Sequence, residues 1–236
     1  VYKRQRPDRV KIYTLNWSLD EISKMLSARL SAFSDEKVVN LNSIVDMEID
    51  AHVLVCYVAG SSPRDLIRAC GRVVDEQVRM EPNSEKITRD KIWLGIKHFC
   101  EERAEELFSR HLSDLRKIGV PTFTNRALAN EVFRVSENAI RPKIKSWEDS
   151  GAVKRVGDVP NPGNRPLYLY GLADIRLCVA ALSNMTIEDI FGNFLLECPN
   201  CKSINISDQH EFTCSCGTFV RLGEARSIYS ICSEVI

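Results

Sequence analysis

Apolar side chains recur every three or four positions along residues 19–33, and this spacing predicts an amphipathic helix. Ser18 and Glu21 can form a capping box at its start, in which each side chain bonds the backbone amide of the other residue. The apolar stretch before it, residues 10–15, predicts a short strand. The start of the first helix is therefore marked in the sequence.

Three further helices are expected in the first half of the chain. One spans residues 49–59 and ends at a glycine, a residue suited to that position. The next begins at Ser62, which can cap it, and Pro63 takes the first position, where a missing N–H is harmless. A long periodic segment covers residues 88–118. This part of the chain is thus predicted to be essentially all helix.

The pattern changes at Gly119, where we expect a domain boundary. Residues 124–133 are predicted to form a helix, and Ser136 can cap a second one. Residues 153–156 and 167–170 alternate like strands on either side of a loop rich in Pro, Gly and Asn. This order resembles bacterial winged-helix DNA-binding domains, in which a helix-turn-helix is followed by a wing.

Basic residues gather on the second of these helices and around the wing. Between residues 124 and 170, eight basic and five acidic side chains give a small positive excess. Basic side chains at these places can neutralise phosphates and enter a DNA groove. The candidates for nucleic-acid contact are Arg141, Lys143, Lys145, Lys154, Arg155 and Arg165. The alternative is a domain that only packs or contacts protein.

Pro142 departs from the resemblance, because it falls inside the second helix and cannot donate to the carbonyl of Asn138. We therefore expect this helix to kink or to start late.

Four cysteines near the C-terminus stand in two close pairs, Cys198 with Cys201 and Cys214 with Cys216, as in a zinc ribbon. Four thiolates leave no ligand position open, so a bound Zn²⁺ would be structural. Because so short a segment cannot build an apolar core, the metal would supply folding free energy. The second pair is unusually close and requires a tighter turn, and His210 is the alternative to one cysteine ligand.

Composition limits the function classes. Lys plus Arg equals Asp plus Glu at 32 each, so overall charge indicates neither nucleic acid nor membrane. The sequence has no membrane helix or signal peptide, which predicts a cytoplasmic protein without a membrane partner. The nine cysteines are an odd number, which argues against a disulfide framework. Four of them stand singly on apolar faces, as reduced thiols do: Cys56, Cys70, Cys100 and Cys178.

Residues 60–68 read Gly-Ser-Ser-Pro-Arg-Asp-Leu-Ile-Arg and resemble a helix start in lid domains of AAA+ and STAND-type P-loop ATPases. The resemblance covers roughly residues 8–118. It implies that Arg64 is a nucleotide sensor, and free backbone amides in a helix's first turn also suit a phosphate. Asp65 is expected to cap the helix, and Arg68 to pair with Asp65 or with the core.

The catalytic part of such an ATPase is not in this sequence. There is no G-x-x-x-x-G-K-[ST] loop and no strand carrying Mg²⁺-binding carboxylates, so this chain is not expected to be catalytic by itself. Residues 1–5 resemble a translated sequencing adapter, which indicates a scar at a truncation. ATP and Mg²⁺ would then bind only in a longer parent, whose N-terminal nucleotide-binding core is missing here.

The predicted fold class is mainly α, in six parts. These are a scar (1–5), a helical lid-like domain (6–118), a winged helix-turn-helix (119–172), a linker helix (173–196), a zinc ribbon (197–221) and a C-terminal tail (222–236). The expected function is the C-terminal half of a P-loop ATPase that binds DNA, another nucleic acid or a protein partner, with a homo-oligomer as one such partner. The alternative is a non-enzymatic DNA-binding regulator whose helical region dimerises.

Overall fold

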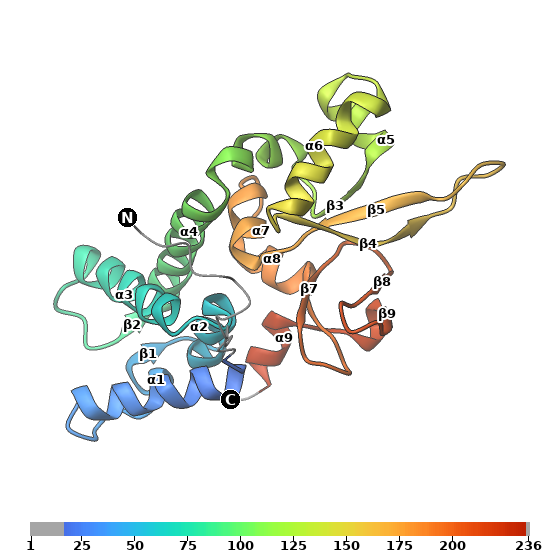
Figure 1. The fold of residues 1–236 in the computed structure, drawn as a ribbon. Helices are drawn as coiled ribbons and strands as arrows, with labels where there is room; N and C mark the ends of the chain where they lie inside the picture. The colour runs from blue at the N-terminus through green and yellow to red at the C-terminus, as the bar shows by residue number, and fades with distance from the viewer. Residues whose placement is uncertain (1–16, 235–236) are drawn as a thin grey trace, which may run out of the picture.

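The computed structural model of the protein describes residues 17–234 and is mainly α, with four small sheets of two or three strands in that range (Figure 1). The predicted scar at residues 1–5 and the predicted strand at residues 10–15 lie outside the described residues.

The first helix forms where its capping box predicts. In α1 (Leu19–Phe33), the Ser18 side chain accepts from the Glu21 amide and the Glu21 carboxylate accepts from the Ser18 amide. A short 3₁₀ turn (Leu41–Ile44) and strand β1 (Val45–Asp46) follow. Asp50 then caps α2 (Ala51–Ala59), which is buried along its whole length.

The two longest helices cross at close range. Ser62 caps α3 (Pro63–Met80), and α4 (Arg89–Ile118) follows β2 (Ile87–Thr88), which pairs in parallel with β1. A side chain on Gly95 of α4 would place its Cβ 2.5 Å from the Cα of Val73, so only glycine permits this approach. The β1–β2 pair was not predicted, because each strand has only two residues.

After α4, three antiparallel strands and a helical pair form a second layer. The elements are β3 (Thr122–Thr124), α5 (Asn125–Ala127), a π-helical segment (Leu128–Phe133), α6 (Glu137–Asp149), β4 (Val153–Val159) and β5 (Leu167–Leu172). The strand order is β3-β5-β4, and the β4–β5 hairpin extends well beyond the helices (Figure 1). The expected late start of α6 is wrong, since the helix begins at Glu137 and continues through Pro142.

The predicted linker helix at residues 173–196 is wrong. The segment holds two helices, α7 (Ile175–Ala181) and α8 (Ile187–Asn193), and then β6 (Leu195–Glu197). The helices are separate because Thr186 caps α8 by accepting from the Asp189 amide. The segment is also not a linker, since α7 packs along α4 and is almost wholly buried.

The predicted C-terminal tail at residues 222–236 is also wrong. After β7 (Ile204–Ile206), β8 (Glu211–Thr213) and β9 (Phe219–Arg221), a 3₁₀ turn (Leu222–Glu224) leads to β10 (Arg226–Ser227) and α9 (Ile228–Ser233). Strand β10 pairs with β6, and the Cys232 carbonyl accepts from the Asp50 amide at 2.8 Å. The chain end is therefore docked beside α2.

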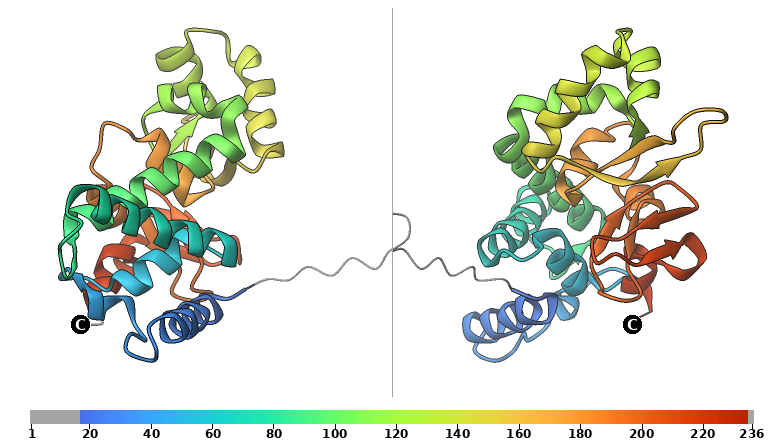
Figure 2. Two further views of the ribbon diagram at one scale, coloured as in Figure 1. Left: turned by 90° about the vertical axis from the view of Figure 1, so that its left-hand side faces the viewer. Right: turned by 45° about the vertical axis from the view of Figure 1, so that its right-hand side comes forward.

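One hydrophobic core runs from Ile22 to Cys232 and includes residues on both sides of Gly119. Gly119 ends α4 with a left-handed φ of 67°, but it does not separate two apolar cores. A second, much smaller core lies between β6, β8 and β9, and its buried members are Leu196, Cys198, Phe212, Cys214 and Val220. Figure 2 shows this C-terminal module, in red, beside the β4–β5 hairpin.

Candidate metal centre and candidate nucleic-acid groove

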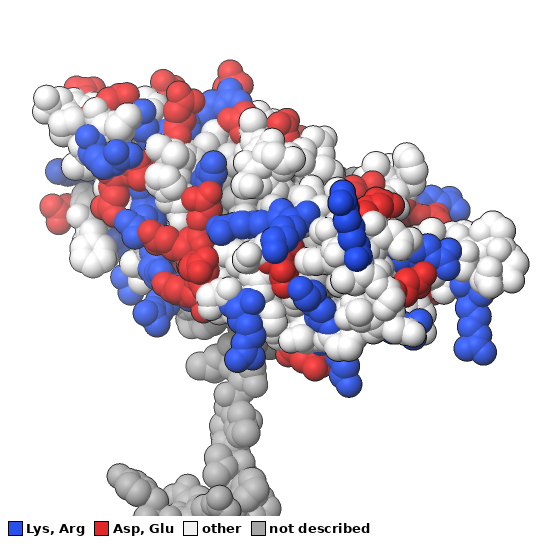
Figure 3. All heavy atoms as spheres, turned by 90° about the horizontal axis from the view of Figure 1, so that it is seen from above, with Lys and Arg blue, Asp and Glu red and all other residues white. Residues whose placement is uncertain are grey.

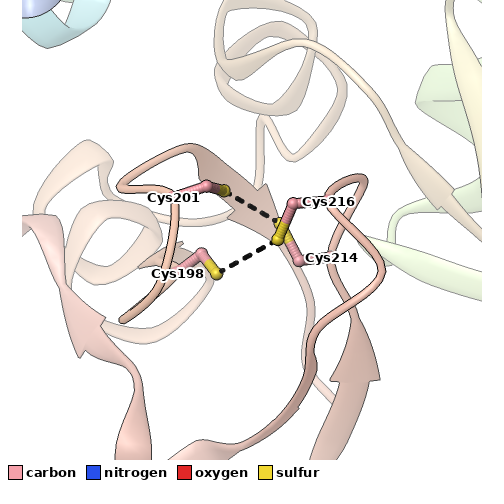
Figure 4. A group of neighbouring side chains, drawn as sticks. All are labelled: Cys198, Cys201, Cys214 and Cys216. Atoms are coloured by element: carbon pink, nitrogen blue, oxygen red, sulfur yellow. Dashed lines mark hydrogen bonds between the residues drawn. The ribbon is translucent and has the colours of Figure 1, made fainter.

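The four paired cysteines converge at one point between the β6–β7 turn and the β8–β9 turn, with their side chains directed toward one another (Figure 4). Their sulfur atoms all lie within 4.8 Å of each other. The Sγ–Sγ distance is 3.9 Å between Cys198 and Cys216 and 3.5 Å between Cys201 and Cys214. Tetrahedral bonds of ordinary Zn–S length would require about 3.8 Å. These four residues could therefore hold a metal ion.

The four cysteines lie in two turns of unequal size. In the first, the Lys202 amide donates to the Cys198 carbonyl at 3.0 Å, and in the second the Gly217 amide donates to the Cys214 carbonyl at 2.9 Å. The second turn closes one residue sooner, as the closer cysteine spacing predicts. Each turn ends in the left-handed region, with φ of 61° at Lys202 and 85° at Gly217.

Polar groups surround the sulfurs. The buried Asn205 side chain donates to Cys214 Sγ at 3.5 Å, and Ser203 Oγ lies 3.0 Å from Cys201 Sγ and 3.1 Å from Cys214 Sγ. Hydrogen bonds to the ligand atoms orient them and tune a bound metal. Asn205 and Ser203 were missed by the sequence reasoning, because nothing in their spacing indicates that they face the sulfurs.

These surroundings change the acidity of the thiols. Burial raises the pKa of Cys214, but hydrogen bonds from the Cys216 amide and from Ser203 outweigh it and bring the pKa to about 5. The Thr218 hydroxyl and amide lower the pKa of Cys216. For Cys198, the Cys201 amide lowers the pKa, while burial and the neighbouring sulfurs raise it to about 11. Part of the cluster is therefore thiolate at neutral pH, which is the form that binds metal.

His210 is exposed and does not belong to the cluster of ligand atoms. The four cysteines predicted to stand singly are free thiols, buried except for half-buried Cys70, and Cys232 of α9 is a fifth free thiol, also buried. Burial raises the pKa of Cys56 to about 12 and that of Cys70 to about 11, so both stay protonated and unreactive.

Lys154 lies beside the cysteine cluster rather than on an open face of the hairpin. It is half-buried on β4, which packs against β8. Burial lowers the pKa of its ammonium group, and the nearby Cys214 and Cys201 raise it. The Lys154 ammonium group therefore interacts electrostatically with these two cysteines.

A second feature is an open groove between α6 and the β4–β5 hairpin, with a volume of about 1170 Å³. Three of the predicted basic residues line it, and none of the three has an ion pair within residues 17–234: Arg141, Lys145 and Arg165. Tyr168 and Tyr170 of β5 also line the groove and were missed, because their alternation reads only as a strand. The groove is thus bounded by cations and aromatic rings.

Two other predicted basic residues already have acidic partners. Lys143 Nζ lies 2.7 Å from Asp114 Oδ2 on α4, and 4.5 Å from the centre of the Phe133 ring. Arg155 pairs with Asp158 at 2.7 Å and stacks on Tyr168 at 3.7 Å. The structure therefore divides the six candidates into three in the groove, two paired and one at the cysteines.

Acidic residues share the groove. Glu137 pairs with Arg126, and Asp158 with Arg155, which leaves Glu148 and Asp149 at the end of α6. Figure 3 shows both signs interspersed on the face seen from above, with no continuous positive surface.

At the start of α3, Arg64 is exposed and makes no ion pair within the described part of the chain. Asp65 does not cap the helix, since that bond comes from Ser62. Asp65 is instead 2% exposed and pairs with Arg103 Nε at 3.1 Å and with Arg176 Nη1 at 2.8 Å. Arg68 pairs with Glu106 rather than with Asp65, through two hydrogen bonds. The expected cap by Asp65 and the expected Arg68–Asp65 pair are thus wrong, because the partners of these two residues come from α4 and α7.

Comparison with known protein families finds no match to this chain, and comparison with curated proteins finds none either. Within residues 17–234, no helix combines the length and apolar character that crossing a membrane requires.

Proposed function

We propose that this chain is a DNA-binding module, in which residues 119–172 act as a winged helix and residues 197–221 as a zinc ribbon that braces it. The observation that carries the proposal is the groove between α6 and the hairpin, where Arg141, Lys145 and Arg165 are free to meet phosphates. Helix α6 would occupy the major groove, and the extended hairpin would be the wing.

Zinc is the metal that the cysteine cluster suits best. Four sulfur donors at nearly tetrahedral spacing favour Zn²⁺ over oxygen-preferring cations. The ion would supply folding free energy to the small core, and no ligand position is left for catalysis. The four ligands would be Cys198, Cys201, Cys214 and Cys216.

The test is the salt dependence of binding to duplex DNA. Each phosphate contact contributes about 0.9 to the slope of log affinity against log salt, so changing Arg141, Lys145 and Arg165 together to Ala should reduce the slope by up to about three. The matched control is Lys143→Ala with Arg155→Ala, because both already have acidic partners. If the control variant loses as much of the salt slope, or if the parent chain does not bind DNA, the proposal is wrong. The alternative of a domain that contacts protein would then remain.

A second proposal is that the chain belongs to a longer P-loop ATPase in which Arg64 senses nucleotide. One observation supports it: Arg64 is exposed in the first turn of α3 and makes no ion pair within residues 17–234. The test is the gene that continues upstream. If a phosphate-binding loop is encoded there, Arg64→Ala in that longer protein should lower ATP turnover without changing the melting temperature. If no phosphate-binding loop is encoded upstream, Arg64 does not sense nucleotide.

A further inference from the structure

Helix α3 exposes a stripe of large apolar side chains. Along one face, Ile67 and Val74 are each 44% exposed and Val78 is 56% exposed. Scattered apolar residues are normal on a surface, but a continuous row on one helix marks an interaction surface. We call this row, with Gly71 between Ile67 and Val74, the α3 stripe.

The stripe continues into an apolar groove between α1 and α3. The groove has a volume of about 340 Å³. Phe33 stands at its side and is 84% exposed, the highest exposure of any large apolar residue within residues 17–234. The rest of the apolar lining includes Leu26, Leu30, Ile67 and Cys70. The α3 stripe and the apolar groove therefore lie side by side on the same face.

The spacing of the stripe is that of a helix-pairing seam. Positions 64, 67, 71, 74, 78 and 81 alternate steps of three and four, as do the contact positions of paired helices. Gly71 sits at the middle of this seam, where an added Cβ would meet nothing within 4 Å. Glycine inside a helix costs about 1 kcal/mol relative to alanine, and no neighbour within residues 17–234 requires glycine at this position. It would allow a second helix to approach closely.

The charges at the ends of the seam select the partner. Arg64 lies at one end, and at the other is Glu81, the residue that ends the helix, whose side chain contacts Lys91 at 3.7 Å and is still 48% exposed. Two α3 helices aligned antiparallel would place Ile67 opposite Val78 and Gly71 opposite Val74, and Arg64 would meet Glu81 at both ends. A parallel pair would instead place like charges together.

We propose that α3 pairs antiparallel with α3 of a second copy of this chain, related by a two-fold axis near Gly71. Each contact then occurs twice, as in other isologous interfaces. Val78 of one copy would lie against Ile67 of the other, beside the apolar groove that Ile67 also lines. The helix dipoles also oppose each other in this arrangement. The inference does not depend on DNA binding.

The first test measures association by sedimentation equilibrium over a micromolar concentration range. The parent chain should be dimeric, and Val74→Asp should be monomeric. The matched control is Leu107→Asp on α4, because Leu107 is also 44% exposed but lies off the stripe, and this variant should stay dimeric. Circular dichroism melting establishes that each variant is folded. A monomeric parent, or equal behaviour of the two variants, overturns the proposal.

The second test fixes the alignment. Arg64→Glu and Glu81→Arg should each weaken the dimer about tenfold, because each creates two like-charge pairs. The double variant R64E/E81R restores both pairs and should recover the parent affinity. If the double variant is weaker than either single variant, the antiparallel alignment is wrong.

Discussion

The two buried cores of this protein are built by different means. The large core joins apolar side chains from Ile22 to Cys232 and is shaped by close contacts such as that of Gly95 with Val73. The small core has five buried members, and two of them, Cys198 and Cys214, belong to the cysteine cluster. In the large core, shape complementarity stabilises the fold. In the small core, the apolar area is limited, and a metal ion bound by the four cysteines would add the missing stability.

The two regions should therefore fail under different changes. A change of side-chain volume should destabilise the large core, while the small core should depend on metal. The regions meet where β4 packs on β8 and along β6, which contributes Leu195 to the large core and Leu196 to the small one.

Removing the metal should have the largest effect. Structural zinc binds with an apparent free energy of about 10 to 16 kcal/mol, so chelation or Cys198→Ser should unfold the two cysteine turns and strands β8 and β9. The helical core should remain folded, because its packing does not use the metal. Metal analysis together with amide hydrogen exchange checks both parts. If no metal co-purifies, or if α2 and α4 lose protection at the same time, the two cores are not independent in this way.

Asp65→Ala should cost about 3 to 5 kcal/mol, because it leaves the guanidinium groups of Arg103 and Arg176 without their buried partner. The measurement is urea unfolding monitored by circular dichroism. The control is Asp75→Ala, whose carboxylate is 67% exposed and 3.7 Å from Arg72, and it should cost less than about 1 kcal/mol. Similar losses in both variants would mean that the buried pairs do not tie α3 to α4 and α7.

Gly95→Ala should destabilise the large core by about 1 to 3 kcal/mol, because the added methyl group would overlap the α3 backbone. Gly192→Ala on α8 is the control, since its added Cβ would meet nothing within 4 Å. Helix propensity should then make that variant equal to or slightly more stable than the parent. Thermal melting compares the two, and a harmless Gly95→Ala would contradict the close crossing of α3 and α4.

Lys154→Gln should weaken metal binding about tenfold, because it removes a positive charge beside the thiolates. Competition with a chromogenic chelator measures this affinity. Lys145→Gln is the control and should show the reverse, with unchanged metal affinity and a smaller salt slope for DNA. If Lys154→Gln weakens DNA binding but leaves the metal affinity unchanged, Lys154 belongs to the nucleic-acid surface and not to the metal site.

Local features of the fold could be predicted from the sequence. The capping box of Ser18 and Glu21, the Ser62 cap and the two cysteine turns all form as their spacing indicates. Each depends on residues within four positions of one another, and their geometry follows from backbone hydrogen bonds. The cluster of four cysteines was predictable for the same reason, because only two such turns had to meet.

The rest required the tertiary structure. The sequence alone determined the helices between residues 19 and 118 and which four cysteines come together. It did not determine that Lys143 would meet Asp114, that Lys154 would face the sulfurs, or that Arg176 would reach Asp65. That α7 and α9 pack into the large core could not be predicted from the sequence either. The physical reason is that a charge or a short apolar helix takes its role from neighbours far away in the chain, and only the folded packing decides which neighbours those are.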